Sequence, residues 1–420
     1  MTILNKKTWA SVVRDGGKRP LDDVKNLNQA EEGLMLFCDD IMSSILTKLP
    51  IESLLRSSCV CKRWRNLIQE SHFINMQVNK SLQSPRFVLV DESRVWILDR
   101  EVKARIPIET WKTREIILGK DLKVVYIAAA YHSYLCLCRY DDCDHISIYN
   151  PITKECIKLP TPNYSLMKSN IGLGFDGISK KYKVVRSYDD VFSDFLHTMK
   201  CEILTLGENS WRKVYPPCQV KSTKPLFVDG GFHWVMHKVI NPDLGEILTL
   251  DIASESFQTI KITSSVRQPD AASNGRLELI NIGESLALVE ARTSCIHVWQ
   301  LVDRKTTGYS VYQHTTHDVS TINKTFITAA YKLVGMMSNG NFLFQLHHFP
   351  LYHPCYCGDD WCEEDYAEDS YDYKQKARFV QYFPQEKKFR LIHAPDVPDN
   401  FLTYFFTPNL GSLNALTELP

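Results

Sequence analysis

The chain has 420 residues, of which 44% are hydrophobic and 11% aromatic, so it can bury a sizeable core. Its 49 basic and 49 acidic residues give zero formal net charge, which argues against a general nucleic-acid binder, because such proteins need many unpaired cations. No stretch reaches the ~18 apolar residues of a membrane span. Thirteen cysteines, several inside apolar runs (Cys59, Cys61, Cys136 and Cys138), suit buried reduced thiols of a cytoplasmic or nuclear protein better than a disulfide framework.

Residues 1–33 are polar and charged and show no sustained hydrophobic period. This pattern is typical of a flexible leader. The segment has cations but no apolar core, so it does not fit a secretory signal.

Residues 37–80 predict a small unit of three helices. Asp39 or Asp40 can cap a first helix, and Pro50 ends it. Ser53 can cap a second, shorter helix.

The third helix of this unit runs through Val60 and Trp64. Its basic residues are expected to face outward: Lys62, Arg63 and Arg65. So small a unit cannot bury all of its apolar surface internally. The surplus apolar face predicts an obligate partner.

After residue 87 the pattern changes to strands, and one unit recurs. The last hairpin of each unit is its most regular part, and six are found, at 95–106, 146–159, 201–214, 247–260, 296–311 and 379–392. We take as equivalent turn positions Asp99, Asn150, Leu206, Asp251, Val302 and Phe383. The first four intervals between them lie near the ~40–50 residues of propeller blades, and the fifth holds roughly thirty more.

Repeats of this kind predict a β-propeller, because each small sheet must stack on its neighbours. A stack of β-sandwiches is the alternative. An open ring would leave unpaired strand edges, and the aromatic segment 401–408 is left over from the six units. We expect it to close the ring by pairing with the first unit near 87–98, and we expect 409–420 to contribute little.

A gap-free series of short motifs occupies residues 37–74. It comprises an acidic start, an Ile-Leu pair, a Leu-Pro break, a Ser-Leu-Leu-Arg helix and a Val-Cys-Lys-x-Trp signature, at Asp39-Asp40, Ile45-Leu46, Leu49-Pro50, Ser53–Arg56 and Val60–Trp64. The series resembles an F-box. It departs from the family at the front, where Phe37-Cys38 replaces the usual Leu-Pro.

The F-box resemblance implies a Skp-family adaptor and a cullin-based ligase core as partners. It also implies that the module uses its apolar residues for an intermolecular core rather than only for its own. The adaptor-binding residues are then Phe37, Ile41, Ile45, Leu46, Leu49, Pro50, Leu54, Leu55, Val60, Cys61 and Trp64.

A second series of motifs follows in a fixed order over about residues 87–395. Its members are Tyr149–Lys154, Gly174–Asp176 with Tyr182–Val185, Ser210–Val214, Gly230–Trp234, Leu250-Asp251 with Phe257, and Ile296–Trp299. The series is similar to the F-box-associated domain of plant F-box proteins. It implies an α+β multidomain chain, with a small three-helix F-box followed by a kelch-like propeller over 87–408 that serves as the receptor surface.

Gly172 to Gly177 spell G-x-G-x-x-G. A dinucleotide site needs this loop to open a helix, but here a strand pattern follows. We therefore expect tight turns between propeller strands instead.

An acidic insertion is predicted at about 350–376. Metal-capable side chains gather at and just before it, at His347, His348, His353, Cys355, Cys357 and Cys362. Cys355 and Cys357 are spaced too closely for a usual zinc half-site. Three interpretations stay open: a solvated acidic loop, a docking loop for a basic target, and a metal site. We expect no metal.

The sequence favours an adaptor over an enzyme. It contains no familiar catalytic or phosphate-binding motif, and His233 is expected to pack within a blade. We expect a non-catalytic, substrate-recognising subunit of a ubiquitin ligase in the cytoplasm or nucleus, with no cofactor, nucleic acid or membrane as partner and with an unknown protein substrate. The alternative is a propeller-type enzyme or glycan-binding module with an incidental helical segment.

Overall fold

In the computed structural model, the described residues are 38–410 with gaps at 84–85, 92–93, 101–108, 117–124, 140–144, 164–168, 190–198, 218–222, 237–245, 262–275, 283–284, 292–294, 305–309, 319–328, 338–339, 349–376, 394–401 and 407–409. The predictions for the leader 1–33, for Phe37 and for the acidic insertion therefore lie outside the described residues.

The described chain begins with a helical module, which we define as α2 to α5. The helices are α2 (Asp39–Thr47), α3 (Ile51–Ser57), α4 (Lys62–Gln69) and α5 (Ser71–Gln83). The sequence predicted three helices, and α5 is a fourth. Phe73 is 1% exposed and packs with Ile68 of α4 in the core of the module.

The two predicted N-caps of the module are wrong. Cys38, not an aspartate, precedes α2 without a side-chain cap, and Asp39 and Asp40 lie in the first helical turn. Pro50 directly precedes α3, so Ser53 lies inside that helix. Pro50 is the N-cap residue of α3, and its φ of −60° lies in the range to which the proline ring is restricted.

The third predicted helix starts later than expected, and two of its basic side chains form polar contacts within the module. Val60 lies in the turn before α4, and the Cys61 Sγ accepts a hydrogen bond from the backbone N–H of Trp64. Arg63 forms an ion pair of 2.8 Å with Asp39, and the Arg65 Nε donates to the Ser58 carbonyl. Arg63 therefore links α4 to the start of α2, and Arg65 links α4 to the end of α3, whereas the sequence predicted that both would simply face outward.

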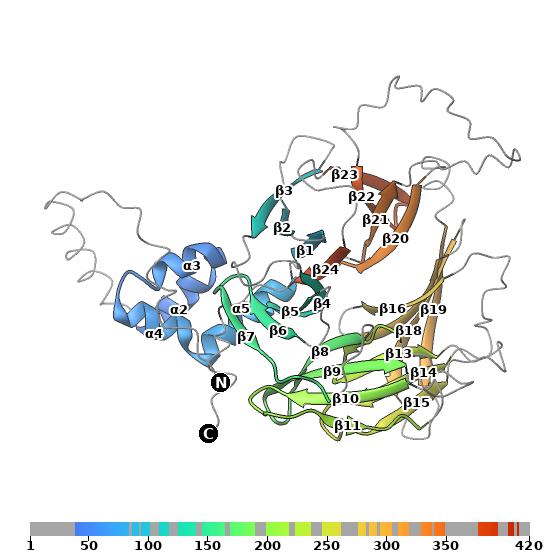
Figure 1. Cartoon of the computed structure of the whole chain (residues 1–420). Coiled ribbons are helices and arrows are strands. Elements are labelled where there is room, and N and C mark those ends of the chain that lie inside the picture. Colours follow the sequence, from blue (N-terminus) through green and yellow to red (C-terminus); the bar gives the residue numbers. More distant parts are fainter. Residues whose placement is uncertain are drawn as a thin grey trace, which may run out of the picture.

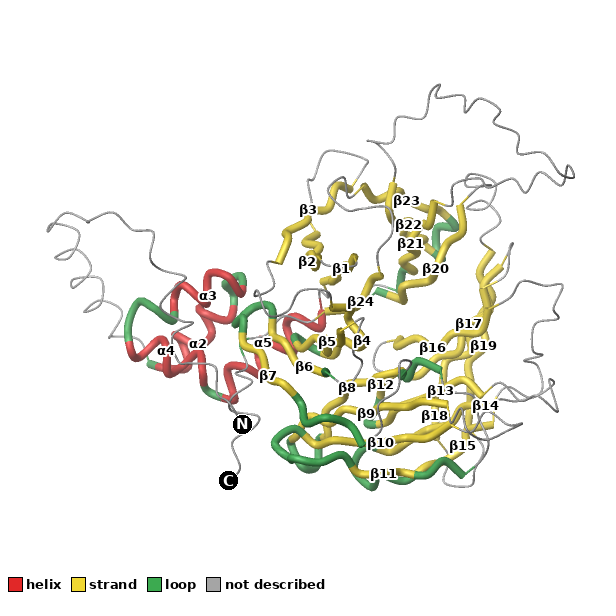
Figure 2. Tube along the Cα trace, viewed as in Figure 1, coloured by secondary structure: helices red, strands yellow, loops and turns green. Residues whose placement is uncertain are grey.

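The described strands form six four-stranded blades arranged around a ring (Figures 1 and 2). Blade 1 contains β24 (Leu402–Phe406), β1 (Arg86–Asp91), β2 (Arg94–Arg100) and β3 (Glu109–Ile116). Blade 2 contains β4 (Val125–Tyr131), β5 (Tyr134–Arg139), β6 (Ile146–Asn150) and β7 (Glu155–Lys158), and blade 3 contains β8 (Asn170–Asp176), β9 (Lys181–Asp189), β10 (Met199–Thr205) and β11 (Arg212–Val214).

The other three blades have the same order of strands. Blade 4 contains β12 (Leu226–Val228), β13 (Gly231–Met236), β14 (Glu246–Asp251) and β15 (Phe257–Lys261), and blade 5 contains β16 (Arg276–Ile282), β17 (Ser285–Ala291), β18 (Cys295–Arg304) and β19 (Ser310–Asp318). Blade 6 contains β20 (Ala329–Met336), β21 (Phe342–His348), β22 (Ala377–Phe383) and β23 (Lys388–His393). The propeller is confirmed, and the β-sandwich alternative is excluded.

The predicted hairpins are the last two strands of each blade. Two of their turns share a chemistry: the Oδ1 of Asn150 accepts from the backbone N–H groups of Ile152 and Thr153, and the Oδ1 of Asp251 accepts from those of Ala253 and Ser254. Such side chains favour turns because they replace a backbone acceptor. In blade 1 the second strand of the hairpin starts at Glu109, later than predicted.

The ring closes as predicted. Strand β24 pairs antiparallel with β1, with Tyr404 opposite Val88. The outermost strands of blades 6 and 1 also touch, because β23 pairs parallel with β3 at Ile392 and His393. Two separate pairings thus join the end of the ring to its beginning.

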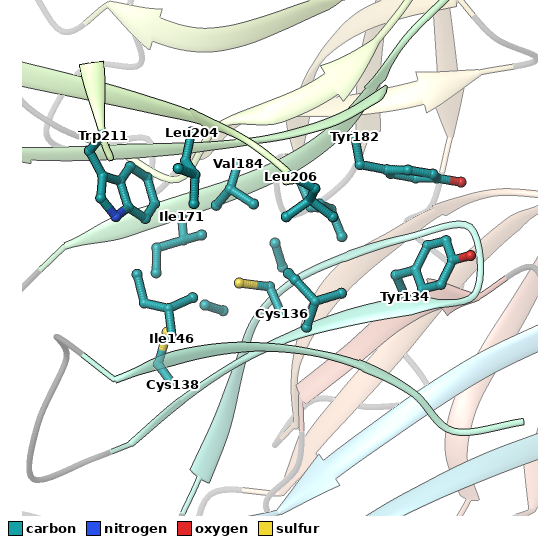
Figure 3. Packing of buried hydrophobic residues seen from close by; sticks show 14 residues of the cluster. Tyr134, Cys136, Cys138, Ile146, Ile171, Tyr182, Val184, Leu204, Leu206 and Trp211 are labelled. Atoms are coloured by element: carbon teal, nitrogen blue, oxygen red, sulfur yellow. The ribbon is translucent and has the colours of Figure 1, made fainter. Parts of the chain in front are cut away.

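Apolar side chains fill the spaces between adjacent blades. Figure 3 shows one such core, in which Cys136, Cys138 and Ile146 of blade 2 meet Leu204 and Leu206 of blade 3. Cys136 and Cys138 are fully buried free thiols, as predicted. The prediction is wrong for Cys59, which is an exposed free thiol.

Candidate functional site

Helix α2 of the helical module carries two apolar stripes one residue apart. Met42 and Leu46 are each 1% exposed and face inward, whereas Ile41 and Ile45 are each 46% exposed. Residues four apart lie on one face of a helix, so each pair forms a continuous stripe. Only the first stripe is used by the module itself.

The helical module exposes a further aliphatic side chain outside α2. Val60, in the turn before α4, is 48% exposed. The inner core of the module is nevertheless closed around Leu46, Leu54, Ile68 and Phe73. The exposed aliphatic side chains therefore do not reflect a missing core, and large exposed apolar groups of this kind mark interaction sites.

The structure separates the predicted adaptor-binding residues into several groups. Exposed are Ile41, Ile45, Pro50 and Val60; half-buried are Leu49, Leu55, Cys61 and Trp64; buried are Leu46 and Leu54; and Phe37 lies outside the described residues. Leu49 and Trp64 pack against the core of the module. Their binding role stays a prediction, but the exposed members are the ones accessible to another protein.

Helix α3 attaches the module to the propeller. Ile51 is 4% exposed and belongs to a cluster with Val88 of β1 and Tyr149 and Ile152 of blade 2, and Leu55 packs against the same cluster. Sequence reasoning missed this contact, because residues of α3 and of the blades are far apart in the chain. Leu55, expected to face the adaptor, is occupied here by the propeller.

Leu410, just beyond β24, joins the module and the propeller a second time. It packs against the propeller cluster around Ile51 and also against the core of the module. The prediction that 409–420 contribute little is therefore wrong at this residue. Together these contacts hold α3 and Leu410 against blades 1 and 2.

Helix α5 braces α2 from its C-terminal end. The Gln77 Nε2 and the Lys80 Nζ both donate to the Thr47 carbonyl, at 2.9 and 2.7 Å. Carbonyls at the end of a helix lack helical partners, so this contact stabilises the helix that carries the exposed stripe. The spacing of Phe73, Met76 and Lys80 is a helical signal that could have revealed α5.

His233, the propeller histidine considered for catalysis, has a structural role. His233 is fully buried in blade 4 and lies 2.8 Å from the Thr249 Oγ1 and 3.1 Å from the Val228 carbonyl, as predicted. Among the described residues, no group of three His, Cys, Asp or Glu side chains is placed to hold a metal ion. The His347 to Cys362 segment is outside this statement, because its side chains are not described.

A half-buried histidine, His132, lies at the β4–β5 turn of blade 2. The His132 Nδ1 is 3.2 Å from the Tyr182 hydroxyl, and its ring stacks on Tyr131. Burial lowers the pKa of His132 from 6.5 to about 4. The ring is therefore neutral at neutral pH, and Nδ1 can accept a hydrogen bond from Tyr182.

Comparisons with known proteins agree with this division of the chain. Residues 34–75 match the F-box domain family, and residues 100–357 match the family described as F-box associated beta propeller domain. None of the described helices has the length and hydropathy to cross a membrane.

Two relatives from Arabidopsis thaliana illustrate the similarity. F-box protein At1g11270 is 24% identical over 286 residues, which are 61% of this chain and 82% of the relative. F-box protein At5g49610 is 25% identical over 293 residues, which are 66% of this chain and 78% of the relative. Among solved structures, TolB from Acinetobacter baumannii matches with a TM-score of 0.37 at 10% identity, covering 64% of this chain and 62% of that chain.

Proposed function

Because the chain belongs to the plant-type F-box proteins with an F-box-associated β-propeller, we propose that it is the substrate-recognition subunit of an SCF-type ubiquitin ligase. One observation carries the proposal: the F-box exposes Ile41, Ile45 and Val60 although its own core is closed. A Skp-family adaptor is the partner that would cover this surface. The adaptor would connect the chain to a cullin-based ligase core in the cytoplasm or nucleus.

The proposed role is non-catalytic and depends on position. The ligase core would hold a ubiquitin-charged enzyme, and the propeller would hold the target near it. Bringing two reactants together in this way raises their effective concentration. The packing of Ile51 and Leu55 against blades 1 and 2 supports this role, because it fixes one side of the F-box to the receptor domain.

A charge on the exposed stripe tests the adaptor interaction. We expect Ile45→Asp to abolish co-purification with a Skp-family adaptor, because an unpaired carboxylate buried in an interface costs several kcal/mol. Ile178→Asp is the matched control, since Ile178 is 83% exposed on the β8–β9 turn of the propeller. We expect this control to retain the adaptor fully.

Exposed positions make the test specific. Leu54 is fully buried in the F-box core, so a charge there would unfold the module and remove binding for a trivial reason. Ile45→Asp leaves the core intact, and an unchanged thermal melt would confirm this. Undiminished adaptor binding by a folded Ile45→Asp variant would contradict the proposal and favour a propeller enzyme or a glycan-binding module.

A further inference from the structure

A groove of about 280 Å³ runs between blades 2 and 3 at the outer part of their shared core. One wall is formed by β7 and the residues that follow it, and the other by the end of β10 and the β10–β11 turn. The apolar lining residues are Ile157, Leu159, Pro160, Leu204 and Leu206, and the others are Lys158, Gly207, Glu208 and Asn209. Leu204 and Leu206 extend toward blade 2 in Figure 3, so the groove continues the inter-blade core outward.

Trp211 fixes the two walls of the groove to each other. Its indole Nε1 donates to the Pro160 carbonyl at 2.9 Å, and the Asn163 Nδ2 donates to the Trp211 carbonyl at 3.2 Å. The residues after β7 are therefore tied to blade 3. A site held in this way is already formed before a ligand binds, which lowers the entropic cost of binding.

Strand β7 is the outer edge of blade 2. Leu159 donates its backbone N–H to Ile146, so the backbone groups of Ile157 and Glu155 also face β6. In an antiparallel pair the intervening residues point the other way. The N–H and C=O groups of Cys156 and Lys158 therefore face outward and offer an extended peptide a place to pair.

The charge beside the groove selects the kind of peptide. Glu208 lines the groove and forms an ion pair with Arg212, which also binds Glu255 of blade 4. Lys158 is exposed and borders the groove, but its side chain leaves β7 on the face opposite to that of Ile157, which packs against the inter-blade core. A strand paired with β7 would thus place alternate side chains beside the groove and beside Lys158.

We propose that this groove binds an extended segment of a target protein, as an added strand on β7, in which apolar side chains alternate with acidic ones. The apolar side chains enter the groove, and the acidic ones pair with Lys158. This inference rests on the proposed function, because it names the surface by which the adaptor subunit takes its target. Tyr149 and Ile152 of blade 2 contact α3, so the segment would lie on a blade that also carries the F-box.

The test uses the purified full-length chain and a phage-displayed library of short random peptides. We expect the enriched peptides to alternate apolar and acidic residues. The most enriched peptide is then labelled with fluorescein, and its Kd is measured by fluorescence polarisation. The same peptide with lysine in place of its acidic residues is the matched probe.

Three substitutions examine the three parts of the site. Asn209→Trp fills the groove, and Cys156→Pro removes an outward N–H, which an edge strand tolerates; we expect each to weaken binding about tenfold or more. Cys156→Ala keeps the N–H and should bind normally. Lys158→Glu should transfer the preference to the lysine-containing peptide, whereas Lys180→Glu, an exposed cation on another turn, should not.

The outcomes separate this proposal from the adaptor role. Peptide binding is measured without the adaptor, so Ile45→Asp should leave the Kd unchanged, and Asn209→Trp should leave adaptor binding unchanged. If Cys156→Pro does not fold, Asn209→Trp still decides. The proposal is overturned if no peptide is enriched, if Asn209→Trp leaves the Kd unaltered, or if the chain forms a dimer that Cys156→Pro dissociates, since a second copy would then occupy the edge.

Discussion

At the residue scale, the G-x-G-x-x-G motif shows that a glycine can be needed because a side chain of another blade packs against it. Its own backbone conformation need not be one that only glycine adopts. The sequence predicted tight turns, and this holds for Gly177 only. Gly172 and Gly174 lie within β8, where an added Cβ would overlap Phe232 and Phe227 of blade 4. The sequence shows that side chains are absent at these positions, but it does not show which residues approach them.

Gly174→Ala should therefore destabilise the propeller by about 1–3 kcal/mol, the usual range for overpacking. The β8 backbone would have to move away from Phe227. Chemical denaturation followed by tryptophan fluorescence would measure the loss. Gly177→Ala, with no atom within 4 Å of its added Cβ, should be nearly neutral, and equal losses for both variants would contradict the packing explanation.

The apolar residues of the F-box illustrate the same limit. Motif matching identified Ile41, Ile45, Leu46 and Leu54 together as binding residues. Only the fold distinguishes the buried Leu46 and Leu54 from the exposed Ile41 and Ile45. On a helix with two apolar stripes, the sequence alone cannot decide which stripe faces the chain's own core.

At the element scale, adjacent blades 3 and 4 are joined by a network of buried and partly exposed charges as well as by apolar contacts. The Lys183 Nζ contacts Asp176 and Glu255 at 3.2 and 2.9 Å, and Arg212 binds Glu255 at 2.6 Å. Burial alone would raise the pKa of Glu255, but hydrogen bonds from Arg212 and Lys183 outweigh it and hold this pKa below 4.5. Several charges acting together stabilise more than isolated surface pairs do.

This network predicts a pH-dependent contribution to stability. A carboxyl with a lowered folded pKa stabilises the protein fully above its unfolded pKa and loses that effect as pH falls through the folded value. Glu255→Gln should therefore lower the Tm at pH 7, and its difference from the wild type should shrink below about pH 4.5. Glu386→Gln, at an exposed carboxylate 3.8 Å from Lys388, should show no difference at any pH; a constant deficit for Glu255→Gln would refute the linkage.

The strands themselves were more predictable than their contacts. Hairpins at 146–159 and 247–260 were found because their β-branched runs flank the turn-forming Asn150 and Asp251. Helix α5 was not predicted, and the start of β3 was placed too early. Such boundaries depend on pairing with other strands or helices, and local pattern contains little of that information.

At the scale of the whole molecule, closure of the ring could be predicted and attachment of the F-box could not. The segment 401–408 was left over from the repeats and had the alternation of a strand, which identified its role. Ile51 and Leu55, by contrast, resemble ordinary F-box residues. Their packing against Val88, Tyr149 and Ile152 depends on how blades 1 and 2 are placed in the folded ring, and the local sequence pattern does not contain this information.

Truncation tests the importance of this closure. A chain ending at Pro398 lacks β24 and exposes the edge of β1, so we expect it to aggregate and to be digested rapidly by protease. A chain ending at Leu410 keeps β24 and the contact of Leu410 with both domains, and it should behave like the full chain. Both would be expressed with the adaptor and compared by solubility and limited proteolysis. A soluble, resistant Pro398 variant would show that β24 is dispensable.

The pairing of β24 with β1 also has a consequence for synthesis in the cell. The ribosome delivers the F-box helices and β1 first, but one of the two partner strands of β1 is translated after all the other described strands. The propeller is therefore incomplete until β24 has been translated, although the F-box helices have already emerged. A nascent chain stalled before β24 would carry an exposed strand edge, a feature that cellular chaperones and proteases can recognise.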